Sequence, residues 1–249
     1  MKSPAHHRSR LDQLLYEKGL CASREKAQRS ILAAQVLVNG VCITKAGTKV
    51  PVDSELMLLE SQRYVSRGGY KIQGALDAFS INPQGLLCLD LGSSTGGFTD
   101  CLLQRGAKKV TGIDVGVGQL AWSLRKDPRV EIREGINARY LQSCDFDEPF
   151  DLIVGDLSFI SLRCILPAAF PLLKPEGCMI FLIKPQFELS QKEVGRGGIV
   201  REPLLREKAV NSIRQWVESR GHYFEKVMES PLPGATGNRE YLALLRPKI

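Results

Sequence analysis

Residues 86–100 read L-L-C-L-D-L-G-S-S-T-G-G-F-T-D, in which an apolar run meets an acidic residue and then a glycine-rich turn. Only Asp90 interrupts the run from Leu86 to Leu91, as expected of a parallel strand buried on both faces. Glycine lets the backbone turn tightly near a ligand, and a helix starting at Phe98 would point its N-terminus at the same crevice. The stretch therefore predicts a strand, loop and helix that hold a nucleoside cofactor.

The spacing of the glycines bears on which cofactor is bound. Gly92 to Gly97 reads G-x-x-x-G-G, which lacks the G-x-G-x-x-G of a pyrophosphate site, and the chain has no G-K-[ST] pair for a nucleoside triphosphate. A carboxylate at Asp90 would repel a pyrophosphate but attract the ammonium group of S-adenosylmethionine. We expect S-adenosylmethionine in preference to NAD.

A second short strand is predicted at Val110 to Val115, V-T-G-I-D-V. Asp114 ends it at the spacing where an acidic residue binds ribose hydroxyls. Sites for NAD and for S-adenosylmethionine share this feature, so Asp114 supports a nucleoside without choosing which one. A solvated aspartate at a strand end is the alternative.

Charge is unevenly distributed along the 249 residues, which carry a net charge of +7 and a pI near 9.1. Residues 1–52 hold nine lysines and arginines against Asp12, Glu17 and Glu25, so nearly all of the surplus lies there. Such a basic segment favours a polyanionic partner.

The seven cysteines show no C-x-x-C or Cys/His spacing, so neither a metal site nor a disulfide is predicted. Cys88, Cys101 and Cys178 stand in apolar runs and are expected to be buried, reduced thiols of a cytosolic protein. The chain has neither a leader-like apolar segment nor about 18 consecutive apolar residues, so we expect a soluble, cytoplasmic protein.

The N-terminal segment predicts two helices and a hairpin. Leu11, Leu14 and Leu15 follow helical spacing up to Gly19, and Ser23 is a plausible N-cap for a helix that reaches about Ala33. Its Ala27 and Ile31 would face the core. Val36–Val38, Asn39-Gly40 and Val41–Ile43 form a strong hairpin signal.

This N-terminal pattern, with R-L-D-Q-L-L at its start and V-L-V-N-G near its end, resembles the alpha-L RNA-binding motif of a small-subunit ribosomal protein and of pseudouridine synthases. The resemblance covers about residues 8–67. Basic side chains on this unit would remain free for phosphates. The residues predicted to bind RNA are Arg8, Arg10, Arg24, Lys26, Arg29, Lys45, Arg67 and Arg196. A basic cap that merely packs on the larger domain is the alternative.

Residues 60–66 are short and polar and predict a linker, so we place the two domains at residues 1–62 and 63–249. From Arg67 onward helix and strand alternate, which indicates an α/β, doubly wound, mostly parallel sheet with an antiparallel hairpin at one edge. The predicted strands are Leu86–Leu91, Val110–Asp114, Val130–Glu134, Leu152–Asp156, Met179–Lys184, Phe224–Ser230 and Tyr241–Leu245.

Ligands of such sheets bind beyond the carboxyl ends of the strands, where Asp90, Asp114, Asp156 and Lys184 stand. Asp156 is followed by L-S-F instead of the Pro-Pro-aromatic turn of amino-group methyltransferases, which disfavours N-methylation of a base. A cytosine C5 methyltransferase needs a nucleophilic cysteine, usually after proline, whereas Cys164 follows an arginine. Both classes are therefore disfavoured.

Methylation of a hydroxyl requires removal of its proton, and a lysine can do this when burial lowers its pKa. Lys184 follows the apolar residues of M-I-F-L-I-K-P, so its amine is expected to lie in a partly buried site of low dielectric. Asp156 and Glu240 would orient it, and Lys71 would be a second cation that holds the substrate oxygen. Alternatively, Lys71 is solvated on an early helix and Glu240 merely begins an edge strand.

Five motifs closely resemble one family: S-R-G-G-Y-K at 66–71, D-L-G-S-S-T-G-G-F-T-D at 90–100, G-D-L-S-F-I-S at 155–161, I-K-P-Q-F-E at 183–188 and N-R-E-Y-L at 238–242. They resemble the TlyA-type proteins, often labelled haemolysins, which are FtsJ-like ribosomal RNA ribose 2'-O-methyltransferases. The resemblance covers essentially the whole chain. It implies methyl transfer from S-adenosylmethionine to a cytidine ribose 2'-oxygen in ribosomal RNA, within an assembled subunit.

The resemblance also implies roles for individual residues. The Lys-Asp-Lys-Glu tetrad of the family corresponds to Lys71, Asp156, Lys184 and Glu240. Asp90 and Gly92 would lie at the methionine end of the cofactor, Asp114 at the ribose and Asn137 near the adenine, where many relatives have aspartate. The full predicted cofactor set is Asp90, Gly92, Ser93, Ser94, Gly96, Gly97, Phe98, Asp114, Val115, Asn137 and Asp156.

Other readings stay open at this point. The loop G-R-G-G at residues 195–198, with Arg196, is either a mobile loop that closes over RNA or a plain surface turn. A noncatalytic RNA-binding or ribosome assembly factor would keep the cofactor fold without transferring a methyl group. A cytolysin, which the family label suggests, would need a membrane-active element that the sequence does not reveal.

Overall fold

The structure is a computed structural model that describes residues 7–59 and 63–248. The chain divides into two compact units, Met1–Gln62 and Arg63–Ile249, which are described separately. Residues 1–6 of the predicted basic tail and residues 60–62 of the predicted linker lie outside the described residues.

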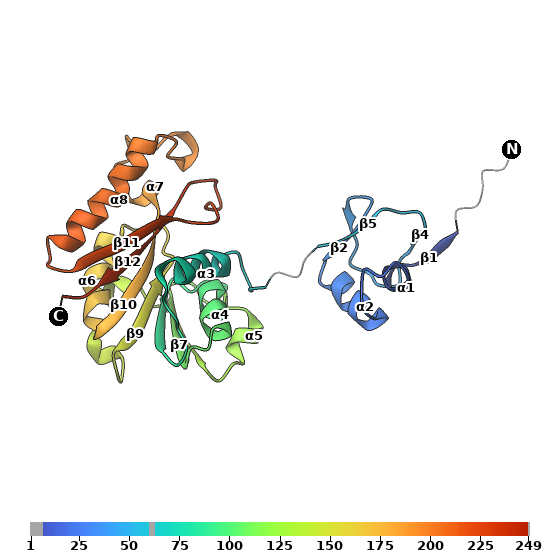
Figure 1. The fold of residues 1–249 in the computed structure, drawn as a ribbon, viewed down its shortest axis with the longest axis horizontal. Helices are drawn as coiled ribbons and strands as arrows, with labels where there is room; N and C mark the ends of the chain where they lie inside the picture. Colours follow the sequence, from blue (N-terminus) through green and yellow to red (C-terminus); the bar gives the residue numbers. More distant parts are fainter. Residues whose placement is uncertain (1–6, 60–62, 249) are drawn as a thin grey trace. The chain divides into compact units, whose positions relative to one another are not determined.

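Within residues 7–59, the first unit contains two helices and two small antiparallel sheets (Figure 1). Strand β1 pairs with β4, and the other sheet has the order β3-β2-β5. The elements are β1 (Arg8–Arg10), α1 (Leu11–Glu17), α2 (Arg24–Leu32), β2 (Val36–Val38), β3 (Val41–Cys42), β4 (Lys49–Pro51) and β5 (Leu56–Leu58).

The helix cap, the buried helix face and the hairpin predicted for this unit are present in the structure. The Ser23 side chain caps α2 by accepting a hydrogen bond from the backbone N–H of Lys26 at 3.1 Å. Ala27 and Ile31 of α2 are fully buried in a core shared with α1 and β2. Asn39 joins the antiparallel strands β2 and β3 with a positive φ, as the hairpin signal requires.

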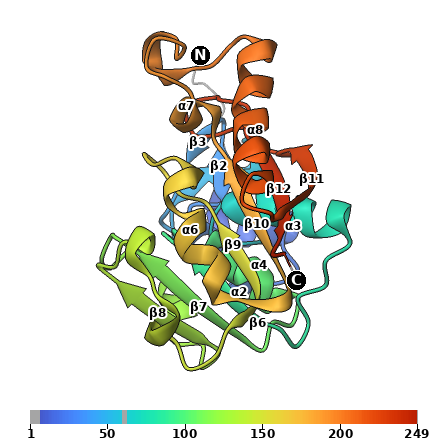
Figure 2. The ribbon, with the colours of Figure 1, turned by 90° about the vertical axis from the view of Figure 1, so that its left-hand side faces the viewer.

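The second unit is built on a seven-stranded sheet with the order β11-β12-β10-β9-β6-β7-β8 (Figure 2). Neighbouring strands from β10 to β8 are parallel, and β12 is antiparallel to both β10 and β11. The strands are β6 (Leu87–Leu91), β7 (Lys109–Asp114), β8 (Val130–Glu134), β9 (Phe150–Gly155), β10 (Leu173–Ile183), β11 (Tyr223–Glu229) and β12 (Tyr241–Arg246). The predicted fold class, a doubly wound sheet with an antiparallel edge hairpin, is confirmed.

Helices cover both faces of this sheet, with α3, α4 and α5 on one face and α6 and α8 on the other (Figure 1). The α-helices are α3 (Gly68–Phe79), α4 (Gly97–Gln104), α5 (Trp122–Arg125), α6 (Leu166–Ala169), α7 (Pro185–Glu188) and α8 (Pro203–Glu218). Short 3-10 helices are η1 (Ala138–Tyr140), η2 (Ser143–Asp145), η3 (Leu162–Cys164), η4 (Phe170–Leu172) and η5 (Arg196–Gly198).

Successive side chains of a strand point to opposite faces of the sheet, so each face has its own hydrophobic core. In β10, Ile180 and Leu182 pack with α3 and α4, whereas Phe181 and Ile183 pack on the opposite face with α6 and α8. Cys88, Cys101 and Cys178 are buried, as predicted, in the core on the α3 side. The near-continuous apolar runs of the central strands follow from this burial on both faces.

The main departures from the predicted strands are at their ends. Strand β10 begins at Leu173, ahead of the predicted Met179, and its pairing with β9 is shifted between Leu173 and Cys178. Asp156 and Lys184 were predicted as last strand residues, but each lies one residue beyond its strand. Among the described residues, no helix has the length and apolar character needed to cross a membrane.

Candidate functional site

A cavity of about 520 Å³ opens at the carboxyl ends of β6, β7 and β9, where parallel sheets of this kind bind ligands. Six predicted cofactor residues line it: Gly92, Ser94, Asp114, Val115, Asn137 and Asp156. Apolar side chains, including Ile136, Leu157 and Ile165, complete the wall. The size and the mixture of carboxylate and apolar groups suit a nucleoside.

A smaller cavity of about 190 Å³ adjoins the first, because Gly92, Ser94, Asp156 and Ser158 line both. Ser93, Gly97 and Phe98 from the predicted cofactor set line this second cavity, together with Ser66 and Gly68. Its wall is mostly hydroxyl and backbone groups. It offers a polar extension to the nucleoside-sized cavity.

Asp114 lies at the end of β7 and organises the rim of the larger cavity. Its Oδ2 accepts a hydrogen bond from the backbone N–H of Ser94 at 2.8 Å, and its Oδ1 accepts one from Gly116 at 2.7 Å. A carboxylate has about four acceptor sites, so capacity is left for two ribose hydroxyls. Asn137, which caps η1 by accepting from the Arg139 N–H at 3.0 Å, faces the same cavity.

Asp90 lies behind the walls of both cavities. Its side chain is 0% exposed and lines neither of these cavities. Asp90 has the strand parity of Cys88, which packs on the α3 and α4 face, so its Oδ2 instead accepts hydrogen bonds from Thr99 N at 3.0 Å and Thr99 Oγ1 at 2.7 Å. Through these hydrogen bonds it joins β6 to α4.

Burial raises the pKa of Asp90 to about 7 from an ordinary value of 3.8, and Oδ1 has no hydrogen-bond partner among the described residues. The folded state thus holds this proton at pH values where the unfolded chain has lost it, so the stability contribution falls as pH rises from about 4 to about 7. Asp90→Asn should remove that fall. The check is urea denaturation of wild type and variant at pH 5 and pH 8, with a stability difference that favours the variant at the higher pH; equal differences at both pH values would contradict it.

Two glycines of the loop serve packing as much as ligand approach. A Cβ at Gly96 would lie 2.3 Å from Leu124 Cδ1, and Gly96 lines neither cavity. A Cβ at Gly97 would lie 2.2 Å from Ser66 Oγ and 2.9 Å from Gly69 N. The start of α4 therefore touches the start of α3 with no side chain between them.

Lys184 and Asp156 form an ion pair at the ends of β10 and β9, with Lys184 Nζ 2.7 Å from Asp156 Oδ1. Lys184 Nζ also donates a hydrogen bond to Ser158 Oγ at 2.8 Å. Both partners line the cavities described above. Lys184 itself lines neither cavity, but its amine is held by two residues that line both.

Lys71 of α3 and Glu240 form a second ion pair, 2.6 Å long, with side chains that are only 10% and 3% exposed. Ile183 pairs with Tyr241 in the sheet, so Lys184 and Glu240 each stand one residue beyond the last pair, at the same end of neighbouring strands. Their parity matches Leu182 and Leu242, which pack on the α3 face. The four predicted catalytic residues therefore meet as two adjoining ion pairs.

In the first unit, the carboxylate of Asp12 binds two of the residues that were predicted to bind RNA. Asp12 is 0% exposed, and it pairs with Arg10 at 2.9 Å and Arg24 at 3.3 Å and accepts from Gln28 at 2.8 Å. Hydrogen bonds from Arg10 hold the pKa of Asp12 well below its usual range. Arg24 was expected to be free and is not, because the nearby buried carboxylate needs a partner.

The other predicted RNA-binding side chains are exposed. Arg8 donates to the Lys49 carbonyl at 2.7 Å, Arg67 precedes α3 and Arg196 lies in η5. Lys26, Arg29 and Lys45 are exposed on the first unit. Arg10 and Arg24 keep side chains that are about half exposed, so each guanidinium still presents donors to solvent.

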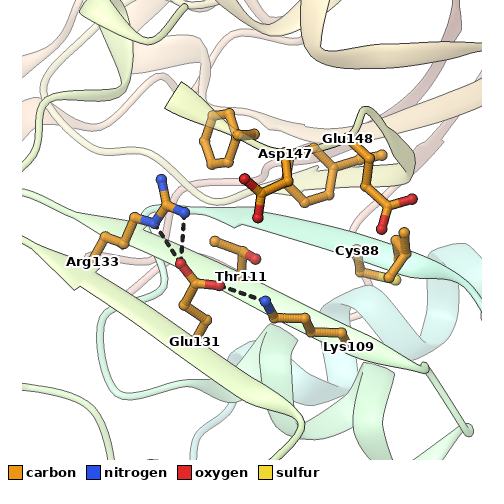
Figure 3. Close-up of a pocket in the computed structure, with 10 residues that line it drawn as sticks. Cys88, Lys109, Thr111, Glu131, Arg133, Asp147 and Glu148 are labelled. Atoms are coloured by element: carbon orange, nitrogen blue, oxygen red, sulfur yellow. Dashed lines mark hydrogen bonds and ion pairs between the residues drawn. The ribbon is translucent and has the colours of Figure 1, made fainter. Parts of the chain in front are cut away.

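A different cavity, of about 60 Å³, has mostly polar walls. Figure 3 shows Glu131 between Lys109, at 2.5 Å, and Arg133, at 2.6 Å. Leu87 and Lys109, which line it, are the first residues of β6 and β7, so it lies at the opposite end of the sheet from the strand ends that bind ligands. We assign it no function.

Several site residues were missed by the sequence reasoning. Gln119 lines the larger cavity and accepts from Ser94 Oγ at 3.2 Å. Phe159, also on the cavity wall, is 90% exposed and has a φ of 64°. The signal for Ser158 and Phe159 was their place directly after Asp156 at a strand end, whereas nothing local marks Gln119.

The fold and the site together define an α/β enzyme domain of the methyltransferase class. Residues 64–246 match the FtsJ-like methyltransferase family, and residues 9–56 match the S4 domain family. The chain belongs to the FtsJ-like methyltransferases and carries an S4 domain, and the expected resemblance to TlyA-type proteins is confirmed.

Relatives of known name support this assignment. A Mycobacterium tuberculosis protein named 16S/23S rRNA (cytidine-2'-O)-methyltransferase TlyA is 45% identical, over 96% of this chain and 90% of its own length. Hemolysin A of Brachyspira hyodysenteriae is 43% identical, over 94% of this chain and 98% of its own length. A solved structure of a hemolysin-labelled protein from Streptococcus thermophilus, 41% identical, superposes with a TM-score of 0.75 over 98% of this chain and 90% of that one.

Proposed function

We propose that this protein is an S-adenosylmethionine-dependent methyltransferase that modifies a cytidine ribose 2'-oxygen in ribosomal RNA. The observation that carries the proposal is the Lys184 amine, held by Asp156 and Ser158, which line both cavities, with the ion pair of Lys71 and Glu240 beside it. The named activity of the M. tuberculosis relative supports the choice of substrate.

The cavities fit S-adenosylmethionine. Gly92 brings the backbone to the wall they share, where a Cβ would lie 2.9 Å from the Asp156 carbonyl oxygen. Asp114 would take the ribose hydroxyls, Asn137 and the apolar wall would take the base, and the small polar cavity beside Ser93 would hold the methionine end. When bound there, this cofactor supplies an electrophilic methyl group.

The side chains around Lys184 would then move one proton. Nζ would accept the proton of the ribose 2'-hydroxyl, which would free that oxygen to take up a methyl group from the bound cofactor. Asp156 and Ser158 fix the position of Nζ, and Lys71, oriented by Glu240, stabilises the negative charge that develops on the 2'-oxygen. Phe159 adds an apolar ring at the rim of the cavity.

The direct test is to incubate the protein and labelled S-adenosylmethionine with isolated small and large ribosomal subunits and to map the modified nucleotide by mass spectrometry. A 2'-O-methylcytidine is the expected product. Binding to subunits without methyl transfer would favour an assembly factor, and transfer to a base nitrogen or carbon would overturn the proposed chemistry.

The S4 domain is expected to bind ribosomal RNA with an affinity that depends on the salt concentration. Because phosphate contacts release counterions, rRNA binding should weaken steeply as salt rises, and Lys26→Ala or Arg29→Ala, each of which removes an exposed cation, should reduce the magnitude of the log–log slope by about 1. Fluorescence anisotropy of a labelled rRNA fragment at several salt concentrations measures the slope. Arg220→Ala, which removes an exposed arginine stacked on Trp216 in the other unit, is the control and should leave the slope unchanged.

A further inference from the structure

Glu188, at the end of α7, is a buried carboxylate that the chemistry above does not use. Its side chain is 1% exposed. Oε2 accepts a hydrogen bond from Ser161 Oγ at 2.5 Å, and Oε1 accepts one from the backbone N–H of Leu162 at 2.8 Å. Burial raises the pKa of Glu188, and a carboxylate this buried is stable only when such hydrogen bonds replace water.

These contacts join two loops that carry the candidate catalytic groups. Residues 157–161 follow Asp156, and α7 begins directly after Lys184. At one end the loops are joined by Lys184, which contacts both Asp156 and Ser158. At the other end they are joined by Glu188, so the intervening loop is fixed at both ends.

Between these two contacts, the loop has a backbone conformation that residues other than glycine rarely adopt. Phe159 has a φ of 64°, and its ring lies 5.2 Å from that of Phe187, which precedes Glu188 in α7. Such a conformation persists only where surrounding contacts determine it. At this loop the contacts include those of Lys184 with Ser158 and those of two consecutive α7 residues, Phe187 and Glu188.

Ser161 is itself fixed by its neighbours. Its Oγ donates to Glu188 and accepts from the Arg163 backbone N–H at 3.2 Å, as the cap of η3. Arg163 Nη2 donates to the Glu188 carbonyl at 3.2 Å, and its Nε lies 3.9 Å from Glu188 Oε2. The carboxylate therefore sits at the centre of a small network between η3 and α7.

We propose that Glu188 is a positioning residue: through Ser161 and Leu162 it holds loop 157–161 so that Ser158 stays on Lys184 and Phe159 stays at the cavity rim. The proposal rests on the proposed methyltransferase function for its kinetic consequence. Its structural consequence, a loop that depends on a side chain outside it, does not need that function.

The test compares Glu188→Ala, Glu188→Gln and Ser161→Ala with Glu193→Gln. Glu193 is a matched control because it lies just beyond α7 and binds Lys208 and Ser190 at a distance from this network. A misplaced catalytic group costs about 10²-fold in rate, so kcat should fall by about that factor in Glu188→Ala. Glu188→Gln keeps an acceptor for Leu162 and should retain more activity, while KM for the ribosomal subunit should be unchanged in all four variants.

Two further readouts separate positioning from general damage. Ser161→Ala/Glu188→Ala should lose no more activity than Glu188→Ala alone, since both act through one contact. Hydrogen exchange of the cofactor-free protein should increase in residues 156–163 for Glu188→Ala and Ser161→Ala but not for Glu193→Gln. Additive losses, or unchanged exchange in this segment, would overturn the proposal. Absence of methyl transfer by wild type would instead defeat the proposed function, and the exchange data would still test Glu188.

Discussion

Lys184→Ala should lower methyl transfer by about 10²- to 10⁴-fold, the contribution of a positioned general base, while leaving cofactor binding intact. The reason is geometric: Nζ lies within 2.8 Å of Asp156 and Ser158, which line both cavities, whereas the groups proposed to bind the nucleoside lie elsewhere on the wall. Single-turnover assays with labelled S-adenosylmethionine give the rate, and calorimetry gives the cofactor affinity.

The same two strands provide a control. Lys174 of β10 forms a 2.8 Å ion pair with Asp151 of β9, which resembles the Lys184 and Asp156 pair but stands at the opposite end of the sheet. Lys174→Ala removes a comparable charge pair and should keep the wild-type rate. Full activity of Lys184→Ala would refute the proton-transfer role, and equal losses in both variants would assign the effect to the sheet.

Glu240→Ala should destabilise the second unit by about 3–5 kcal/mol, because it leaves the Lys71 ammonium group in a nearly dry site without its partner. The two side chains are 10% and 3% exposed, so water does little to replace the lost carboxylate. Both tryptophans, Trp122 and Trp216, lie in this unit, so denaturation followed by their fluorescence reports its stability.

A double variant distinguishes stability from chemistry. Lys71→Met/Glu240→Leu replaces the ion pair with apolar side chains and should recover most of the stability lost in Glu240→Ala. It should still transfer no methyl group, since it lacks the cation proposed to stabilise the 2'-oxygen. Near-normal activity in this stable double variant would show that the pair is structural only.

Most of the second unit could be predicted from sequence because its signals are local. A continuous apolar run such as Leu87–Leu91 is buried on both faces, and the residue after such a strand must stand at the ligand-binding edge. Asp156 and Lys184 were placed correctly for this reason, although each lies just past its strand. The hairpin around Asn39 and the Ser23 cap followed from equally local chemistry.

The remaining features depend on contacts between distant parts of the chain. Asp90 was assigned to the cofactor because it ends a strand, but its parity turns it toward Thr99 of α4. Arg24 was expected to be free because its helix face is exposed, and Asp12 binds it from another helix. The link between Glu188 and Ser161 spans 27 residues, and neither motif alone predicts it.

The contact at Gly97 limits how this enzyme could change by mutation. Any side chain there would collide with Ser66 Oγ and the Gly69 backbone, and so would displace the helix that carries Lys71. A substitution selected to alter cofactor affinity at this position would also disturb Lys71, which is proposed to stabilise the 2'-oxygen. A substitution of Gly97 is therefore expected to change cofactor affinity and turnover together, and to lower both.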